Sequence, residues 1–147
     1  MSIVPLNIHE FNAITGLIFA QLYKAFPGVE DIDRVGIAKA IGVLGDDWSN
    51  YKLPSGRSFS DVLGFTIGWL AAEEYIRSFG AHPSQNVMLT TKGLAAMNAV
   101  PSELTEPLGT ELRKAVEEGS KSTLDLSRVG DLIGGFFGGL TKSIGGG

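Results

Sequence analysis

Hydrophobic residues in the first half of the chain recur every three or four positions in three separate segments. This spacing places them on one face of an α-helix, which can then be buried against neighbouring elements. Glycine, proline and short polar residues separate the segments, as is typical of helix ends and loops. The pattern therefore predicts three helices, over residues 12–26, 29–43 and 59–76.

The pattern changes after the third predicted helix. Two short runs of β-forming residues, 75–79 and 86–89, flank the turn sequence GAHPSQ and predict a β-hairpin. The hairpin leads into a fourth predicted helix, KGLAAMNAV, which Thr90 or Thr91 can cap and which ends before Pro101. Similar polar residues can cap the earlier helices, namely Asp31 or Asp33 for the second and Ser58 or Ser60 for the third.

The third predicted helix divides into a bulky face and a smooth face. Large apolar side chains are usually buried, so the bulky face is expected to form the core. The other face carries Gly64, Phe65 and Gly68, which would make a small exposed apolar patch of the kind that binds proteins. The residues expected in the core are Phe59, Leu63, Ile67, Leu70, Tyr75, Ile76, Leu89 and Leu94, with Val62 and Trp69 flanking them.

The segments TIGWLAAEEYI and VMLTTKGLAAMNAVP, in this order, resemble the winged helix-turn-helix family. In that family a third helix ends in a Trp-Leu, acidic, aromatic, Ile run, and a wing hairpin returns into a Leu-Thr-x-Lys-Gly-Leu helix start. The resemblance covers Asn12–Pro101, and it departs at Glu74, where the pattern commonly has Gly. It implies a mainly α fold with a small β-hairpin wing, spanning residues 7–101.

The resemblance also implies a contact surface, because the family's third helix enters the DNA major groove and its wing contacts the backbone. Here the exposed face of that helix offers few donors, and the net charge is −4 with a pI near 5.1, which opposes phosphate binding. Protein contact therefore fits this surface better than DNA contact. The candidate residues for a nucleic acid or a partner are Lys52, Arg57, Ser58, Ser60, Gly64, Phe65, Gly68, Arg77, His82, Gln85 and Lys92.

Residues 102–147 are predicted to form a helical, glycine-rich extension, with one helix near residues 106–118. In its last part glycines recur every fourth residue, and this stripe resembles a glycine zipper, on which another helix can approach closely. Three alternatives stand: docking on its own domain or on a second copy, disorder, and membrane association. The expected contact residues are Gly130, Gly134, Phe136, Phe137 and Gly138.

No combination of residues predicts catalysis or metal binding. The chain has no cysteine, its two histidines lie far apart, and the Asp46-Asp47 pair is best explained as solvated loop. We therefore expect no enzyme activity, no cofactor and no metal. We also expect a cytoplasmic location, because the amino-terminal residues lack a signal sequence and no apolar segment approaches the ~20 residues of a membrane span.

The leading functional hypothesis is a non-enzymatic interaction module, a winged-helix adaptor that binds a protein partner or forms a homodimer. Its apolar C-terminal helix would be one contact surface. The first alternative is a dimeric DNA-binding transcriptional regulator, in which dimer symmetry compensates for sparse charge. The second is a membrane-associated effector acting through the glycine-rich tail.

Overall fold

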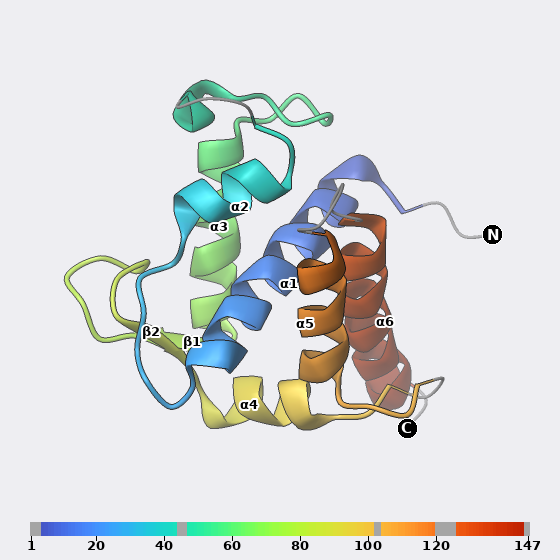
Figure 1. The fold of residues 1–147 in the computed structure, drawn as a ribbon. Coiled ribbons are helices and arrows are strands. Elements are labelled where there is room, and N and C mark those ends of the chain that lie inside the picture. Colours follow the sequence, from blue (N-terminus) through green and yellow to red (C-terminus); the bar gives the residue numbers. More distant parts are fainter. Residues whose placement is uncertain (1–3, 44–46, 102–103, 120–125, 146–147) are drawn as a thin grey trace.

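The computed structural model describes residues 4–43, 47–101, 104–119 and 126–145. It confirms a mainly α-helical fold with a small antiparallel β-hairpin (Figure 1). In chain order the elements are α1 (Leu6–Ala25), α2 (Arg34–Ala40), a short 3-10 helix (Trp48–Asn50), α3 (Phe59–Ala72), β1 (Ile76–Ser78), β2 (Val87–Leu89), α4 (Thr91–Asn98), α5 (Leu108–Gly119) and α6 (Leu126–Gly145).

Helix α1 runs through the middle of the molecule, between α3 with the hairpin and the pair α5 and α6 (Figure 1). Because neighbours cover it on several sides, every residue from Asn12 to Ala20 is buried. It begins at Leu6, six positions before the start predicted from the periodicity. The first turn escaped that prediction because Leu6, Asn7 and Ile8 are exposed and follow no buried stripe.

Helix α2 is shorter at both ends than the predicted helix over residues 29–43. Asp33 caps it, since its Oδ1 accepts a hydrogen bond from the Gly36 N–H at 2.9 Å. Before the cap, the chain is extended and Glu30 pairs with Val87 through two backbone hydrogen bonds of 2.8 and 3.0 Å. These hydrogen bonds use the N–H and C=O groups of Glu30, which would pair within the helix if α2 began earlier.

Helix α3 ends at Ala72, four residues before the predicted end. The Tyr75 N–H donates to the Leu70 carbonyl at 2.9 Å and the Glu74 N–H donates to the Ala71 carbonyl at 3.0 Å, which together form a Schellman motif. That motif needs a left-handed residue, and Glu74 has φ of +65°. Gly is the residue usually favoured at such a left-handed position, so Glu74 is an unusual residue here.

Local capping of the other helices follows the predicted alternatives. The Ser58 hydroxyl accepts from the Asp61 N–H at 3.3 Å and caps α3, and the Thr90 hydroxyl accepts from the Gly93 N–H at 3.1 Å and caps α4. The hairpin pairs Ile76 with Leu89 at its base, where both side chains are buried. Caps and turns were predictable because they depend on neighbours within a few residues.

Helices α5 and α6 pack against α1, so the buried core continues past Pro101. Docking on the chain's own helices is thus the alternative that the structure shows for Leu126–Gly145. The closest approach lies at Gly16 of α1: an added Cβ would collide with Val129 Cγ1 and lie 3.2 Å from Ile133 Cγ1. The glycine spacing of the tail predicted a close approach on α6 and gave no indication of the contribution of Gly16 in α1.

Candidate functional site

An apolar groove of about 400 Å³ lies between the first turns of α1 and one side of α3. Three residues singled out from sequence meet this region, since Arg57 and Phe65 line the groove and Gly68 lies on the adjoining exposed face. Both walls are α-helices, and the part of α3 that lines the groove extends over about two helical turns, from Val62 to Trp69. Its apolar lining consists mainly of Ile8, Phe11, Val62, Phe65 and Trp69.

Phe65 is the most exposed large apolar side chain of the groove, at 69%. Ile8 and Trp69 beside it are 43% and 41% exposed. Single exposed apolar residues are common on soluble proteins and need no explanation. Here three of them line one concave surface, which is the arrangement expected of an interaction site.

Trp69 is held by an aromatic cluster, although sequence analysis placed it among packing residues at the edge of the core. Its ring packs edge-to-face on Phe11, with centroids 5.2 Å apart, and on Phe137 of α6, with centroids 5.7 Å apart. Aromatic pairs prefer such edge-to-face geometries. The groove therefore ends in an aromatic cluster, to which the C-terminal helix contributes Phe137.

Tyr75 lies under the same cluster, with its ring 5.9 Å from that of Phe137. Burial, and secondarily the Glu73 carboxylate, raise the pKa of the Tyr75 hydroxyl above its usual value. Lys92 crosses this ring at 4.4 Å and donates to the Glu73 carbonyl at 2.9 Å. The Lys92 ammonium is therefore held at the carboxyl end of α3, where a cation favours the helix dipole.

The polar wall of the groove is close to neutral. Glu10 is 7% exposed, and its carboxylate accepts from the Ser55 N–H at 2.9 Å and from the Ser55 hydroxyl at 2.5 Å. Arg57 lines the same groove and brings the opposite charge. Glu10 thus fixes the loop that precedes α3, and the groove interior carries no net charge of its own.

The outer face of α3 is smooth beside the groove. Among the described residues, a Cβ added at Gly64 or at Gly68 would meet no atom within 4 Å, and Ala72 continues the same exposed line one turn further. The charged residues of α3 and of the two positions after it are acidic: Asp61 in the first turn, and Glu73 and Glu74 just after the helix. Lys92 of α4 lies at the Glu73 end. The face therefore offers carboxylates where a DNA-reading helix needs donors.

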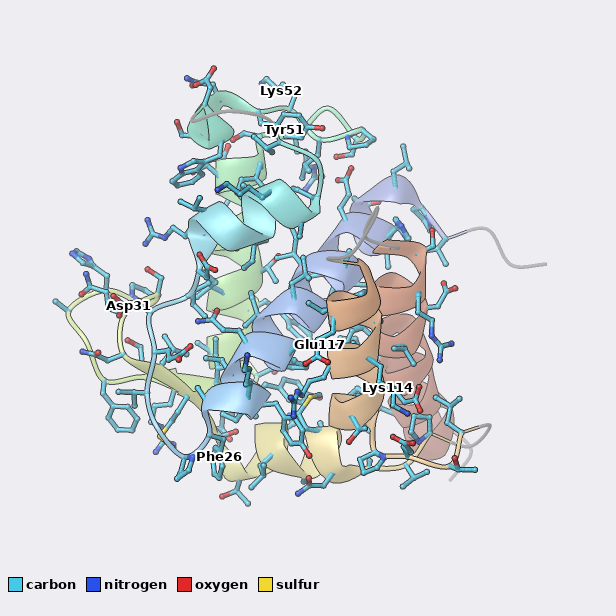
Figure 2. The ribbon with its side chains drawn as sticks, in the orientation of Figure 1. Phe26, Asp31, Tyr51, Lys52, Lys114 and Glu117 are labelled. Carbon is cyan, nitrogen blue, oxygen red and sulfur yellow. The ribbon has the colours of Figure 1, made fainter. Side chains whose placement is uncertain are left out.

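The remaining predicted contact residues do not gather into one surface. Lys52 lies in the loop at the amino end of α3 (Figure 2), where its backbone bridges to that of Ser58, whereas Lys92 lies at the other end. The helix between them is about 21 Å long at 1.5 Å per residue. Ser60 lines a separate hollow beside α2, and Arg77, His82 and Gln85 lie on the hairpin.

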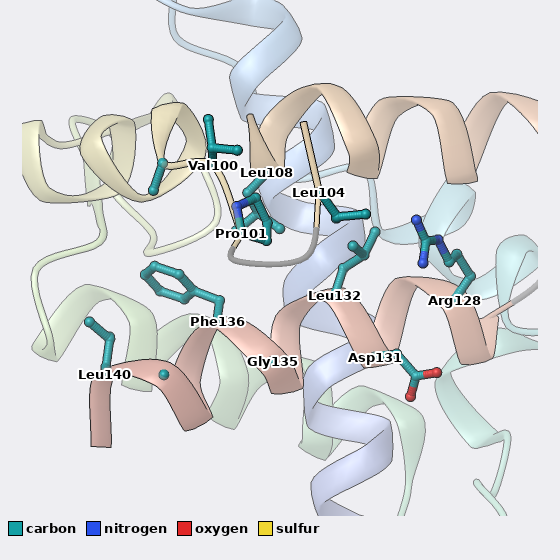
Figure 3. A pocket seen from close by; sticks show the side chains of 12 residues that line it. Val100, Pro101, Leu104, Leu108, Arg128, Asp131, Leu132, Gly135, Phe136 and Leu140 are labelled. Carbon is teal, nitrogen blue, oxygen red and sulfur yellow. The ribbon is translucent and has the colours of Figure 1, made fainter. Parts of the chain in front are cut away.

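The tail residues predicted as contacts lie against different parts of the fold. Gly130 faces His9 and Gly134 faces Asn12, each with an added Cβ 3.2 Å from the nearest atom, and Phe137 joins the aromatic cluster. Gly138 is exposed, with nothing within 4 Å of an added Cβ. Phe136 lines a second hollow of about 630 Å³, between α6 and the segment joining α4 to α5 (Figure 3).

Ile8 and Phe11 are parts of the site that the hydrophobic periodicity did not predict. They belong to the turns of α1 that the periodicity did not predict, and they reach α3 only through the fold. A usable signal existed, because Leu6, Ile8 and Phe11 follow Pro5, a residue that commonly precedes or begins a helix.

Within residues 4–43, 47–101, 104–119 and 126–145, no three His, Asp or Glu side chains gather as a metal site would require. Over the same part of the chain, none of the helices has the length and apolar character needed to cross a bilayer. Comparisons with models of protein families, with curated proteins and with solved structures found no match.

Proposed function

We propose that this chain is a non-enzymatic interaction module that binds a protein partner through the groove between α1 and α3. The observation that carries this proposal is Phe65, which is 69% exposed beside an apolar hollow lined by Ile8 and Trp69. Covering these side chains would remove apolar surface from water, the main favourable term in protein association.

The exposed glycines of α3 give independent support. Each Gly inside a helix costs about 1 kcal/mol relative to Ala. Within the described part of the chain, no packing requires Gly64 or Gly68, since an added Cβ meets no atom within 4 Å. A residue that destabilises its own helix, and that no packing within the protein requires, is expected at a functional position. A smooth helix face that another backbone can approach supplies such a reason.

We further propose the winged helix-turn-helix arrangement for residues 7–101, with residues 102–147 as an extension that braces it. The order of α1, the Glu30–Val87 bridge, α2, α3 and the hairpin supports this reading. In that arrangement α3 takes the place of the DNA-reading helix but presents Phe65 and small residues. The extension then acts through Phe137, which packs against Trp69.

The dimeric DNA-binding regulator is the alternative. Lys52 and Arg57 near the amino end of α3 favour it, because both are exposed and could meet phosphates. Against it stand Asp61 at the same end and the separation of Lys92 from this pair. A membrane effector is less favoured, because insertion of α6 would uncover Val129 and Ile133, which are fully buried.

A photo-cross-linking experiment tests the proposal. The photoreactive residue p-benzoyl-phenylalanine replaces Phe65 in the full-length chain, expressed in its source cells. The same residue at Phe79 is the matched control, because Phe79 is 60% exposed but lies on the hairpin, outside the groove. We expect a discrete protein adduct from position 65 that is absent from position 79.

The other outcomes decide between functions. An adduct with nucleic acid from position 65, together with salt-sensitive binding of random duplex DNA, would favour the regulator. Identical labelling patterns from positions 65 and 79 would contradict the proposed interaction module, because the groove would then show no selective contact.

A further inference from the structure

The kind of partner follows from the groove's walls, and this step rests on the proposed function. Along the groove, the backbone N–H groups are already paired locally from Ile8 in α1, which donates to the Pro5 carbonyl at 3.1 Å, and from Val62 in α3, which donates to the Ser58 carbonyl at 3.0 Å. An extended peptide in the groove would bury its own backbone groups without partners, which costs free energy. A helix satisfies its backbone within itself, so a helix is the segment that this groove accommodates.

The shape of α3 agrees with a helical occupant. Two packed helices usually lie 8–10 Å apart, and small residues allow the shorter separations. On one side of Phe65, the surface of α3 is formed by the small residues Gly64, Gly68 and Ala72, so another helix can approach closely there. On the other side, towards α1, the groove is lined by Ile8 and Trp69. The occupant must present an apolar stripe to Phe65 and small or flat residues to the glycines.

The charge around the groove selects among helices. Glu10 and Arg57 balance each other in the wall, but Asp61 and Glu73 are exposed at the two ends of α3. Lys92 also lies at the Glu73 end, where the adjacent exposed Glu74 offsets its charge and leaves an acidic excess. Neither Asp61 nor Glu73 takes part in an ion pair within the described part of the chain. At 1.5 Å per residue, the two positions lie about 18 Å apart along the helix. An occupant with basic residues near both ends is therefore complementary.

A second copy of this chain fits less well. If α3 packed on α3 around a twofold axis in antiparallel fashion, Asp61 of one copy would meet Glu73 of the other. If the two helices packed in parallel, each carboxylate would meet its own counterpart. Like charges at such positions destabilise association in either arrangement.

We infer that the groove binds an amphipathic helix of another protein, whose apolar stripe covers Phe65 and whose Lys or Arg residues near each end meet Asp61 and Glu73. The apolar contact supplies most of the affinity, and the two charged contacts fix register and direction.

A displayed helix library tests this inference on the full-length chain. The library varies the apolar stripe and the flanking positions of a stable 20-residue helical scaffold, and clones are selected on the wild-type chain. Clones that also bind Phe65→Ser are removed, and Phe79→Ser is the matched control that must retain binding. Phe65 and Phe79 are both exposed, so thermal unfolding of the two variants should match that of the wild type.

We expect the surviving clones to be enriched in Lys and Arg at both flanks. Their affinity should fall about tenfold or more with Phe65→Ser, as for a central anchor of an interface. It should fall several-fold with Asp61→Asn plus Glu73→Gln, about as far as high salt lowers it in the wild type.

The outcomes that overturn the inference are distinct from failure of the proposed function. Phe65-dependent clones without basic enrichment would overturn the basic helix and leave the interaction module intact. A homodimer that Phe65→Ser dissociates would do the same, by identifying a second copy as the occupant. If no clone depends on Phe65, the inference of a helical occupant fails, while the proposed function fails only if cross-linking at position 65 also gives no selective protein adduct.

Discussion

Helices α3 and α6 both carry glycines four residues apart, yet their surroundings differ. On α6, Gly130 and Gly134 lie against α1, where an added Cβ would come within 3.2 Å of His9 and of Asn12. On α3, an added Cβ at Gly64 or at Gly68 meets nothing within 4 Å. The first pair is explained by packing inside the molecule, whereas the second pair has no such explanation.

The difference shows that glycine spacing alone does not identify an interface. Close packing of α6 depends as much on Gly16 of the facing helix as on its own stripe, because Val129 and Ile133 occupy the space beside Gly16. On α3 the glycines lie next to the exposed Phe65. A helix face that combines unoccupied space with an exposed apolar side chain is available for a partner, whereas the glycine face of α6 is already packed within the protein.

The largest effect is expected at the packed face. Gly16→Leu would force a side chain into the space of Val129 and Ile133, so we expect a loss of about 3 kcal/mol in the free energy of unfolding, the upper end of usual overpacking effects. Gly64→Leu is the matched control, and it should lose no stability and gain up to about 1 kcal/mol, because Leu favours the helix over Gly and a Cβ at this position meets none of the described atoms within 4 Å. Urea unfolding of both variants measures the difference, and equal losses would contradict the comparison.

A smaller effect of opposite sign is expected at the open face. Gly64→Ala with Gly68→Ala should raise the free energy of unfolding by about 1–2 kcal/mol, because each replacement favours the helix and meets no neighbour. Gly130→Ala with Gly134→Ala should gain less or lose stability, since His9 and Asn12 must give way. Thermal unfolding monitored by circular dichroism separates the two pairs, and a larger gain on α6 would reverse our interpretation.

The smallest effect is expected where α3 ends. Glu74→Gly should stabilise the chain by about 0.5–1 kcal/mol, because a left-handed residue with a side chain costs about 1–2 kcal/mol and Gly recovers part of it. Glu73→Gly is the control at an ordinary negative φ of −85°, and we expect no gain there. Chemical denaturation of the two variants is the measurement, and a gain at position 73 alone would refute the assigned geometry.

The sequence predicted the local features of the fold well. The caps at Ser58 and Thr90 depend on residues within one turn, so the local sequence predicts them. The exposed face around Phe65 follows from the helical periodicity of α3. The predicted start of α1 and the predicted end of α3 were wrong. Helix α1 begins directly after Pro5, and α3 ends before the left-handed Glu74, and neither boundary coincides with an end of the hydrophobic pattern.

The groove itself was beyond prediction from sequence, because three distant segments form its aromatic end. Phe11, Trp69 and Phe137 meet only when α1, α3 and α6 are in place. No spacing along the chain relates these positions. The acidic character of the surroundings was predictable, since charge is a property of composition and needs no tertiary contact.

The contact between Trp69 and Phe137 has a thermodynamic consequence. Trp69 lines the groove, while Phe137 belongs to the helix that closes the far side of the cluster. If an occupant of the groove favoured a Trp69 position that also strengthens the contact with Phe137, occupancy would favour the docked position of α6. Reciprocity would then require the docking of α6 to raise the affinity for the occupant by the same factor.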